Sequence, residues 1–535
     1  FYNRPADGRI CAGLKVWSRE RPIALSERVP VLENMGFRVV DERTYRIARA
    51  GEEQPVWLHD MLLELAVEKE GAFESLKHRL EACFIAVMRG RAEDDGYNAL
   101  VLAAGLPWRD VALLRAVSRF LRQARSPYSQ DYMWATLRKH AQIAGKIMRL
   151  FHARFDPRLD IAAEERSARE ASLRGEIEAA LEAVESLDED RIVRRFLNAV
   201  EAALRTNFYQ VDSGGQPKSV IAIKYASRKL EGLPRPRPLY DIFVYSPRLE
   251  GVHLRFGKVA RGGIRWSDRP QDFRTEVLGL VKAQQVKNAV IVPVGAKGGF
   301  LPKRLPAGGS REYIQAEGAS SYQLFIASLL DLTDNIGPDG VIAPPNVIRH
   351  DGDDPYLVVA ADKGTATFSD TANRISAEYG FWLGDAFASG GSAGYDHKKM
   401  GITARGAWEA VKRHFREIGV NVASTAFTVA GVGDMSGDVF GNGMLRERTI
   451  RLVAAFDHRD IFIDPDPDPE TSFNERRRLF NQPRSSWQDY DRSRLSKGGG
   501  VYSRAAKEIV LHEEARKLLG LAEAKAAPQE VMRSI

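Results

Sequence analysis

The sequence predicts an α/β core that is preceded by a small α+β module and a helical region. Residues 1–57 hold short β-prone runs on either side of a helix-like segment at 25–36. Residues 58–210 carry apolar residues at three- and four-residue spacing, which is the period of amphipathic helices. From residue 211 to about residue 465, strand-like and helical patterns alternate, and this alternation is typical of an α/β fold.

The two N-terminal regions show packing signals and no chemistry. Gly36 is placed to end the helix of the first module, whose β-α-β order favours a regulatory or packing role. In the helical region Ser129 is placed to cap one helix, and Ser186 with Glu189 matches a capping box for another. The apolar stripes of these helices are interpreted as core.

The core opens with strands and then a helix that leads into a further strand. The expected strands and helix lie, in chain order, at 219–225, 239–245, 252–256, 273–288 (the helix) and 289–293. A second strand-turn-helix pattern starts near residue 423. We therefore divide the core into a first α/β domain over 211–420 and a second, incomplete domain over 421–535.

Composition limits the class of protein. The 535 residues are 44% hydrophobic and 28% charged, as in ordinary globular proteins, and no run of roughly 18 apolar residues predicts a membrane-spanning helix. The net charge of +7 is spread among acidic residues, which argues against nucleic-acid binding. Two cysteines, Cys11 and Cys83, cannot build a disulfide scaffold, so a cytoplasmic protein is expected. The start, at Phe1, suggests a piece of a longer chain.

The most informative stretch is Pro-Val-Gly-Ala-Lys-Gly-Gly at 293–299. Its glycines would let a ligand approach the backbone closely beside Lys297, although the same pattern also occurs in ordinary surface turns. Arg261 and Arg265 stand beside paired glycines, and Lys287 ends the helix that precedes the stretch. Several cations in one cleft require anions, and a dicarboxylate would satisfy them. Salt-bridged or solvated side chains remain the alternative for these cations.

A carboxylate follows the next apolar run. Asp362 is delivered by the run at 358–361 into a glycine-containing loop. A carboxylate near a lysine has a lowered pKa and can accept a proton. A plain turn-forming role for Asp362 stays open.

The last motif resembles a dinucleotide-binding turn. An apolar run leads into Gly431-x-Gly433 and then a helix, with Ser436 at the place of the third glycine and Gly437 after it. The next strand, 450–456, ends at Asp457, the placement of an acid that binds the ribose 2′-hydroxyl. This acid favours NAD over NADP. A plain strand-to-helix turn is the alternative.

Together these segments resemble the large NAD-specific class of bacterial glutamate dehydrogenases. The resemblance covers about 215–465 in detail, and before that it is architectural. The matching motifs, in order, are Arg-Gly-Gly-Ile-Arg, Lys-Asn-Ala, Gly-Ala-Lys-Gly-Gly, Ala-Asp-Lys-Gly-Thr and Gly-Val-Gly-Asp-Met-Ser-Gly-Asp-Val-Phe-Gly-Asn-Gly at 261–265, 287–289, 295–299, 361–365 and 431–443.

The resemblance implies a role for each matching residue. Lys297 would be the catalytic lysine and Asp362 the catalytic aspartate. Lys287 would bind the substrate α-carboxylate, and Arg261 would replace the lysine that binds the distal carboxylate in smaller relatives. Thr403 would contact the nicotinamide amide.

The resemblance also sets the wider expectations. It implies NAD-dependent oxidative deamination of L-glutamate to 2-oxoglutarate and ammonium, with NAD as cofactor and no metal. It implies a substrate-binding domain over 211–420 with Arg265 in its substrate site, a partial Rossmann-like NAD-binding domain over 421–535, and an ACT-like regulatory module over 1–57. We expect a homo-oligomer that binds small molecules and neither nucleic acid nor membrane.

Two other functions remain open. A dehydrogenase for leucine, valine or phenylalanine would share Lys297 and Asp362 but would need no cation such as Arg261. A catalytically silent regulatory or scaffolding piece would explain why only two strands of the nucleotide-binding half are recognisable, since a complete one needs more parallel strands.

Overall fold

The computed structural model describes residues 1–4, 11–48, 55–65, 73–287, 292–305, 308–365, 367–392 and 397–535. These residues form two compact units, Phe1–Gly391 and Ser392–Ile535. The second unit therefore begins before residue 421, where the sequence analysis placed the start of the last domain, and includes 402–417.

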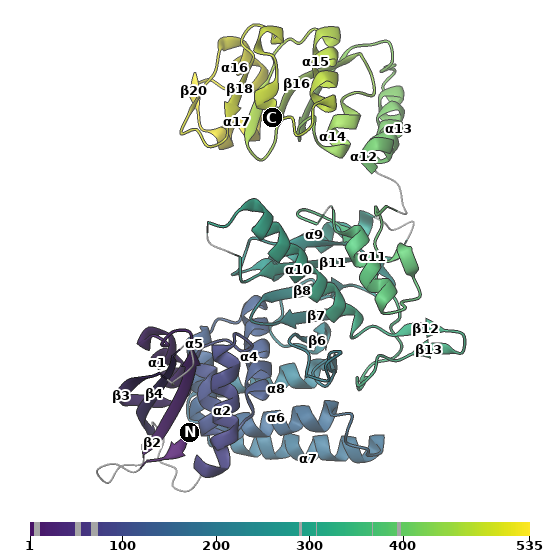
Figure 1. Cartoon of the computed structure of the whole chain (residues 1–535). Helices are drawn as coiled ribbons and strands as arrows, with labels where there is room; N and C mark the ends of the chain where they lie inside the picture. Colours follow the sequence, from purple (N-terminus) through teal and green to yellow (C-terminus); the bar gives the residue numbers. More distant parts are fainter. Residues whose placement is uncertain are drawn as a thin grey trace. The chain divides into compact units, whose positions relative to one another are not determined.

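The first unit starts with a four-stranded antiparallel sheet and one helix, drawn in purple in Figure 1. The sheet order is β1-β2-β4-β3, and the helix α1 packs against it. The bounds are β1 Tyr2–Asn3, β2 Cys11–Arg19, α1 Leu25–Asn34, β3 Phe37–Ile47 and β4 Val56–Leu65. Gly36 adopts a φ of 91° directly after α1, so the predicted helix end is confirmed. The sheet extends past residue 57 because β4 continues to Leu65.

A helical layer follows, as the apolar spacing predicted. Its helices are α2 Phe73–Met88, α3 Leu100–Ala103, α4 Trp108–Gln123, α5 Gln130–Lys139, α6 Ala141–Phe155, α7 Ala163–Leu181 and α8 Leu187–Ala202. The side chains of Ser129 and Ser186 accept hydrogen bonds at the N-termini of α5 and α8, which confirms both residues as caps. The Glu189 half of the predicted capping box is not formed, since the Glu189 carboxylate contacts Lys139 and His140.

The central element of the first unit is a mixed eight-stranded sheet. Its strands are β5 Ala203–Thr206, β6 Ile221–Ala226, β7 Tyr240–Tyr245, β8 Leu249–Arg255, β9 Ala260–Arg261, β10 Gly263–Trp266, β11 Val294–Pro302 and β14 Ala360–Ala361. The order is β14-β10-β11-β8-β7-β6-β5, and β9 pairs with β11. The pairs β9–β11, β10–β11 and β10–β14 are parallel and the rest antiparallel. The strands β8, β9 and β10 thus all pair with β11.

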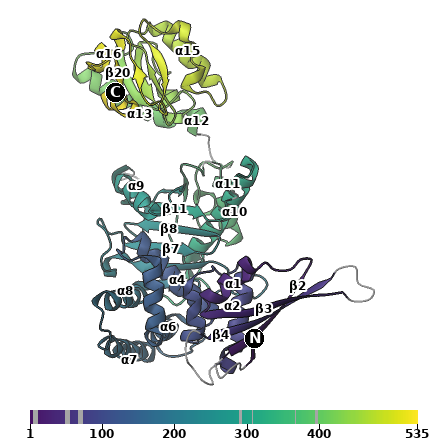
Figure 2. The ribbon, with the colours of Figure 1, turned by 90° about the vertical axis from the view of Figure 1, so that its left-hand side faces the viewer.

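Helices cover both faces of this sheet, and Figure 2 shows α9 and α10 on opposite sides of β11 and β8. On one face α9 (Phe273–Lys287) buries Phe273 and Val277 in a core shared with the helical layer. On the other face α10 (Arg311–Leu330) and α11 (Ser369–Glu378) bury Tyr322, Phe325 and Ile375. Because both faces are covered, β7 and β8 are buried along their whole length, and β6 is buried up to its last residue.

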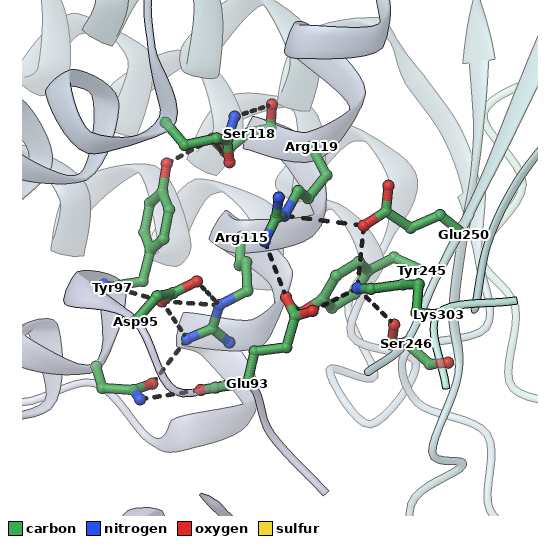
Figure 3. Close-up of polar contacts among 12 residues, drawn as sticks. Glu93, Asp95, Tyr97, Arg115, Ser118, Arg119, Tyr245, Ser246, Glu250 and Lys303 are labelled. Carbon is green, nitrogen blue, oxygen red and sulfur yellow. Dashed lines mark hydrogen bonds and ion pairs between the residues drawn. The ribbon is translucent and has the colours of Figure 1, made fainter. Parts of the chain in front are cut away.

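A polar cluster joins the helical layer to the end of β11 (Figure 3). Glu93, in the loop after α2, contacts Lys303, which follows β11 directly, and accepts hydrogen bonds from Tyr245 at 2.7 Å and Arg119 at 3.4 Å. Lys303 also lies 3.0 Å from Glu250 of β8. Burial raises the pKa of Glu93, but the cations of Lys303 and Arg119 outweigh this effect and lower it to about 2. The cluster therefore holds the helical layer against the strand that carries Lys297.

The long segment between β11 and β14 is fixed to the far edge of the sheet by buried charges. Arg205 of β5 contacts Asp334 at 2.9 Å and Asp351 at 2.6 Å, and Lys224 of β6 contacts Asp351 at 2.5 Å and Asp354 at 2.6 Å. The segment also contains a hairpin of β12 (Asn335–Gly337) and β13 (Gly340–Ile342).

The second unit contains a four-stranded sheet in the order β15-β16-β17-β18. Its elements include α13 Ile402–Glu417, β15 Phe427–Val432, α14 Asp438–Gly443, β16 Ile450–Phe456, β17 Asp460–Ile463, α15 Pro469–Asn481 and β18 Gly500–Ser503. The strands β15 and β16 are parallel and joined through α14, as the sequence predicted. The next two pairings are antiparallel, which the sequence did not predict.

Smaller elements complete the unit. They are α12 His397–Met400, β19 Ile509–Val510, α16 Glu513–Leu519, β20 Lys525–Ala526 and α17 Pro528–Ser534. The core of the unit contains Trp487, which stacks on Phe462 of β17 with ring centroids 4.5 Å apart.

Candidate active site

Lys297 lies within a strand and not in the loop that the sequence suggested. β11 begins at Val294, residues 292 and 293 are not strand, and the remainder of the predicted strand at 289–293 lies outside the described residues. Glycines at 295 and 299 flank the lysine on the same face of β11. A Cβ on Gly295 would lie 2.7 Å from the backbone of α9, and a Cβ on Gly299 would lie 2.6 Å from Val277 of that helix. The glycines therefore let α9 approach the strand on both sides of the lysine.

The lysine meets the predicted aspartate. Lys297 Nζ lies 2.7 Å from Asp362 Oδ2, and Lys297 is only 8% exposed. The strand β10 lies between β11 and β14, and Asp362 directly follows β14. The backbone N–H of Asp362 donates to Thr365 Oγ1 at 3.0 Å, and this hydroxyl donates to the carbonyl oxygen of Ile264 in β10 at 2.7 Å. The pairing of three separate segments thus brings Lys297 and Asp362 together.

Arg265 of β10 also binds this aspartate. Its Nε donates to Asp362 Oδ2 at 3.0 Å, and a terminal nitrogen donates to Glu276 Oε1 at 3.1 Å. Burial alone would raise the pKa of Asp362, but the hydrogen bonds from Arg265 and Lys297 outweigh it and hold that pKa below its ordinary value of 3.8. Asp362 is therefore held as a carboxylate between two cations.

The other two predicted substrate-binding residues lie around the same strand. Arg261 of β9 pairs in register with Gly295 of β11, two residues before Lys297, so the two side chains leave the same face of the sheet. Arg261 is partly exposed. Lys287 is the last residue of α9, and its side chain lies outside the described residues.

Sequence reasoning missed two members of the site, Glu276 and Ser267. Ser267 Oγ donates to Glu276 Oε2 at 2.6 Å, so both oxygens of this carboxylate accept a hydrogen bond, and the Glu276 side chain is 12% exposed. An acidic residue in the first turn of an amphipathic helix is ordinarily explained by the helix dipole, and so Glu276 gave no functional signal.

The glycines before Arg265 are required by close strand packing. A Cβ on Gly262 would lie 1.5 Å from the carbonyl oxygen of Ala296, the residue before Lys297. A Cβ on Gly263 would lie 2.9 Å from the carbonyl oxygen of Ala361, the residue before Asp362. The paired glycines of the Arg-Gly-Gly-Ile-Arg motif thus let the backbones that carry the lysine and the aspartate approach each other.

The predicted cofactor-binding turn lies in the second unit. Gly431 is in β15, and Gly433, just after it, has a φ of 140° and donates its N–H to the carbonyl oxygen of Phe456 at 2.8 Å. A Cβ on Gly433 would lie 2.8 Å from Phe440 of α14. Both glycines therefore allow the turn to pack closely on the helix that follows, as in a dinucleotide-binding crossover.

Asp457 follows β16 at the same end of the sheet as this turn. Its Oδ1 accepts the backbone N–H groups of Arg459 and Asp460, both at 2.7 Å. Its Oδ2 is buried and has no hydrogen-bond partner among the residues that the structure describes. A ribose hydroxyl is a donor that would satisfy this oxygen. Asp464 follows the antiparallel strand β17 and accepts a hydrogen bond from the backbone N–H of Ser496, so it lies away from the turn.

The remaining predicted cofactor residues have more ordinary surroundings. Ser436 donates its hydroxyl to Asp434 Oδ1 at 2.5 Å, and Gly437 is the N-cap of α14. Thr403 is exposed in the first turn of α13. A Cβ on Gly401, the N-cap of α13, would lie 2.7 Å from Asn442 of α14, so α13 starts close to α14.

A family model described as "Bacterial NAD-glutamate dehydrogenase, catalytic domain" matches residues 176–535. The chain belongs to this family. Two further models, described as "Glutamate dehydrogenase, ACT3 domain" and "Glutamate dehydrogenase, helical motif 3", match residues 1–76 and 92–157. The expected ACT-like module, helical region and α/β catalytic core are therefore confirmed.

Curated relatives agree with this assignment. The chain is 54% identical to the NAD-specific glutamate dehydrogenase of Pseudomonas aeruginosa over 100% of the chain and 33% of that protein. It is 52% identical to the protein of the same name from Halomonas elongata, with 98% and 32% covered, and 53% identical to that from Mycobacterium tuberculosis, with 96% and 33% covered. The chain thus spans about a third of the length of the curated relatives it matches.

The part of the chain that the structure describes contains neither a candidate membrane-spanning helix nor a candidate metal site. Within it, no helix has both the length and the apolar composition needed to cross a membrane. Nor do its His, Cys, Asp and Glu side chains form any group of three or more that could hold a metal ion.

Proposed function

We propose that the complete protein catalyses the NAD-dependent oxidative deamination of L-glutamate to 2-oxoglutarate and ammonium. The observation that carries this proposal is the buried contact of 2.7 Å between Lys297 and Asp362. Arg261 of the neighbouring strand β9 pairs with Gly295, two residues before this lysine. The lysine ammonium can stabilise negative charge that develops on a reacting oxygen, and the carboxylate beside it can accept a proton. The family to which the chain belongs uses glutamate, and the names of its relatives agree.

In this proposal Lys297 and Asp362 divide the chemistry. NAD supplies the hydride acceptor when it is bound. Lys297 stabilises negative charge that develops on oxygen when water adds to the imine carbon. Asp362 takes protons from and returns them to the substrate nitrogen, and its lowered pKa keeps it ionised and ready to accept a proton at neutral pH.

The residues of the second unit fit NAD. The turn at Gly431 and Gly433 leaves no side chain between the backbone and a pyrophosphate. The unpartnered Oδ2 of Asp457 fits a ribose hydroxyl and would repel a 2′-phosphate. Arg459 beside it is exposed and lies 3.9 Å from Asp460, so it is partly engaged by an acid.

Substrate recognition is assigned to the cations. We propose that Arg261 and Lys287 bind the two substrate carboxylates, with Arg261 at the distal one. Arg261 is partly exposed, and within the described residues no ion pair joins it to an acid, which leaves its guanidinium available to a ligand. A dehydrogenase of leucine, valine or phenylalanine would not need this cation.

The substrate experiment measures NADH formation by the complete protein with glutamate, leucine, valine and phenylalanine. Glutamate is expected to give the highest kcat/KM. Arg261→Leu is expected to lower kcat/KM for glutamate by about 100-fold or more, because a charge-assisted carboxylate contact is lost. Higher kcat/KM for an apolar amino acid than for glutamate in the native protein would contradict the proposal.

The second candidate, a non-catalytic role for a chain of this extent, rests on the incomplete nucleotide-binding sheet. In the described residues β15 pairs only with β16, whereas a complete dinucleotide-binding fold has parallel strands on both sides of its first strand. NADH formation by the 535-residue chain, compared with the complete protein, distinguishes the two. Equal specific activity would exclude the non-catalytic role.

We further propose that the complete protein is cytoplasmic and forms a homo-oligomer. Its two cysteines within this chain, Cys11 and Cys83, are buried free thiols, which suits a reducing compartment. Ile336, Val341 and Ile342 of the β12–β13 hairpin are 40 to 53% exposed, and burying them between subunits would remove apolar surface from water. Light scattering of the complete protein measures the assembly, and a monomer would contradict it.

A further inference from the structure

Arg265 binds two carboxylates. Its Nε faces Asp362 and one terminal nitrogen faces Glu276, at 3.0 and 3.1 Å. Its side chain is 20% exposed. These contacts use two of the five N–H donors of the guanidinium, and a substrate carboxylate that approached the other donors would meet the negative charges of Asp362 and Glu276.

The second carboxylate is itself held. Glu276 Oε1 accepts from Arg265, and Glu276 Oε2 accepts from Ser267 Oγ at 2.6 Å. Glu276 lies in the first turn of α9, and Ser267 directly follows β10. Ser267 is 2% exposed, and its own N–H donates to the carbonyl oxygen of Phe300 in β11 at 2.9 Å. The arrangement therefore joins one helix and two strands.

We propose, on the basis of the function proposed above, that Arg265 and Glu276 are positioning residues that orient Asp362 toward Lys297, and that Arg265 does not bind substrate. The four side chains carry two positive and two negative charges. Glu276 holds the terminal nitrogen Nη1 and so fixes the orientation of the guanidinium, in which Arg265 gives Asp362 a single hydrogen bond through Nε. The Oδ2 atom that receives it is the one that also contacts Lys297.

The geometry explains why Glu276 is needed. Without its charge, the guanidinium of Arg265 is free to turn and bind Asp362 through two nitrogens, which is the preferred geometry of an arginine and a carboxylate. Two such bonds would compete with Lys297 for Asp362. They would also stabilise the carboxylate further, lower its pKa and make it a weaker base.

Among the described residues, the charged groups that act on Asp362 come from two strands and one helix. Lys297 comes from β11, Arg265 from β10 and Glu276 from α9 through Arg265. The backbone N–H of Lys363 adds a hydrogen bond just after β14. Removing Glu276 takes away the one negative charge among these groups, so the expected change in the pKa of Asp362 is downward.

The test uses Glu276→Gln in the complete protein, with kcat and KM for glutamate measured against pH. We expect kcat to fall by about 10-fold or more, KM for glutamate to stay within about 2-fold, and the acid limb of kcat/KM to move to lower pH by roughly 0.5 to 1 unit. Asp272→Asn is the matched control, since Asp272 pairs with Arg269 in the exposed loop before α9 and has no contact with Asp362. It is expected to leave all three quantities unchanged.

Two further variants keep the proposal falsifiable if Glu276→Gln does not fold. Arg265→Lys keeps the charge but replaces the planar guanidinium, whose Nε and terminal nitrogen face the two carboxylates in fixed directions, by a single ammonium, and it is expected to lower kcat with KM nearly unchanged. Ser267→Ala removes one bond to Glu276 and is expected to have the same effect to a smaller degree. A rise in KM for glutamate at constant kcat in Arg265→Lys would show substrate binding and overturn the proposal, as would unchanged pH profiles in all three variants. Absence of glutamate turnover in the native protein would instead overturn the proposed function.

Discussion

The contact of Glu93 with Lys303, just after β11, predicts how much the free energy of unfolding changes when the Glu93 charge is removed. Glu93→Gln removes the charge that Lys303 and Arg119 share. The side chain of Glu93 is only 18% exposed, so its cations lose a partner that water replaces incompletely. We expect the free energy of unfolding of the first unit to fall at neutral pH.

The magnitude follows from the pKa of Glu93, which lies at about 2 instead of 4.5. At about 1.4 kcal/mol per unit, this difference corresponds to roughly 3 kcal/mol of stability. Because the pKa is lower in the folded protein, the contribution is complete well above pH 4.5 and is lost as the pH falls toward 2. For a unit of this size, the loss corresponds to a fall in Tm of roughly 3 to 6 °C at pH 7.

Calorimetry of both proteins at pH 7, 5 and 4 measures this. The difference in Tm between the native protein and Glu93→Gln should be largest at pH 7 and smaller at pH 4. Glu27→Gln is the control, since Glu27 pairs with Arg21 on the exposed surface, where such pairs contribute little. Equal Tm values at pH 7, or a difference that does not change between pH 7 and pH 4, would refute the reasoning.

Two other predictions concern the two sites, and a third concerns the core of the second unit. Gly262→Ala should lower both the Tm and kcat, the latter by more than about 100-fold, because its Cβ would lie 1.5 Å from the carbonyl oxygen of Ala296 and separate β10 from β11; a near-native kcat would contradict this. Asp457→Asn should raise KM for NAD by about 10-fold with kcat retained, and an unchanged KM would move the ribose contact elsewhere. Trp487→Ala should destabilise the second unit by about 3 to 5 kcal/mol in denaturant unfolding, since Trp487 is fully buried and donates to the carbonyl oxygen of Gly433 at 2.9 Å; a loss below about 1 kcal/mol would contradict its place in the core.

The sequence predicted the elements whose signals are local. The strands β6, β7, β8 and β16, the helix α9 and the caps at Ser129 and Ser186 all follow from short-range patterns, and all are present. The motif order also predicted that Lys297 and Asp362 belong to one site, and they are 2.7 Å apart.

The sequence did not predict features that depend on partners far along the chain. Glycine-rich β11 gives a loop signal, yet it is a strand because β8, β9 and β10 all pair with it. The role of Glu276 depends on where α9 lies against β10, which no local pattern encodes. The antiparallel strand β17 follows a tight turn that Asp457 stabilises, so the same aspartate that matched a cofactor motif also has a structural contact.

The account depends most directly on Lys297. The decisive measurement is glutamate-dependent NADH formation by Lys297→Ala in the complete protein, with NAD binding measured by calorimetry on the same sample. The account predicts a loss of about 1,000-fold or more in kcat, since both the electrophilic cation and the partner of Asp362 are removed, while NAD affinity stays within about 2-fold. A kcat near that of the native protein would contradict it.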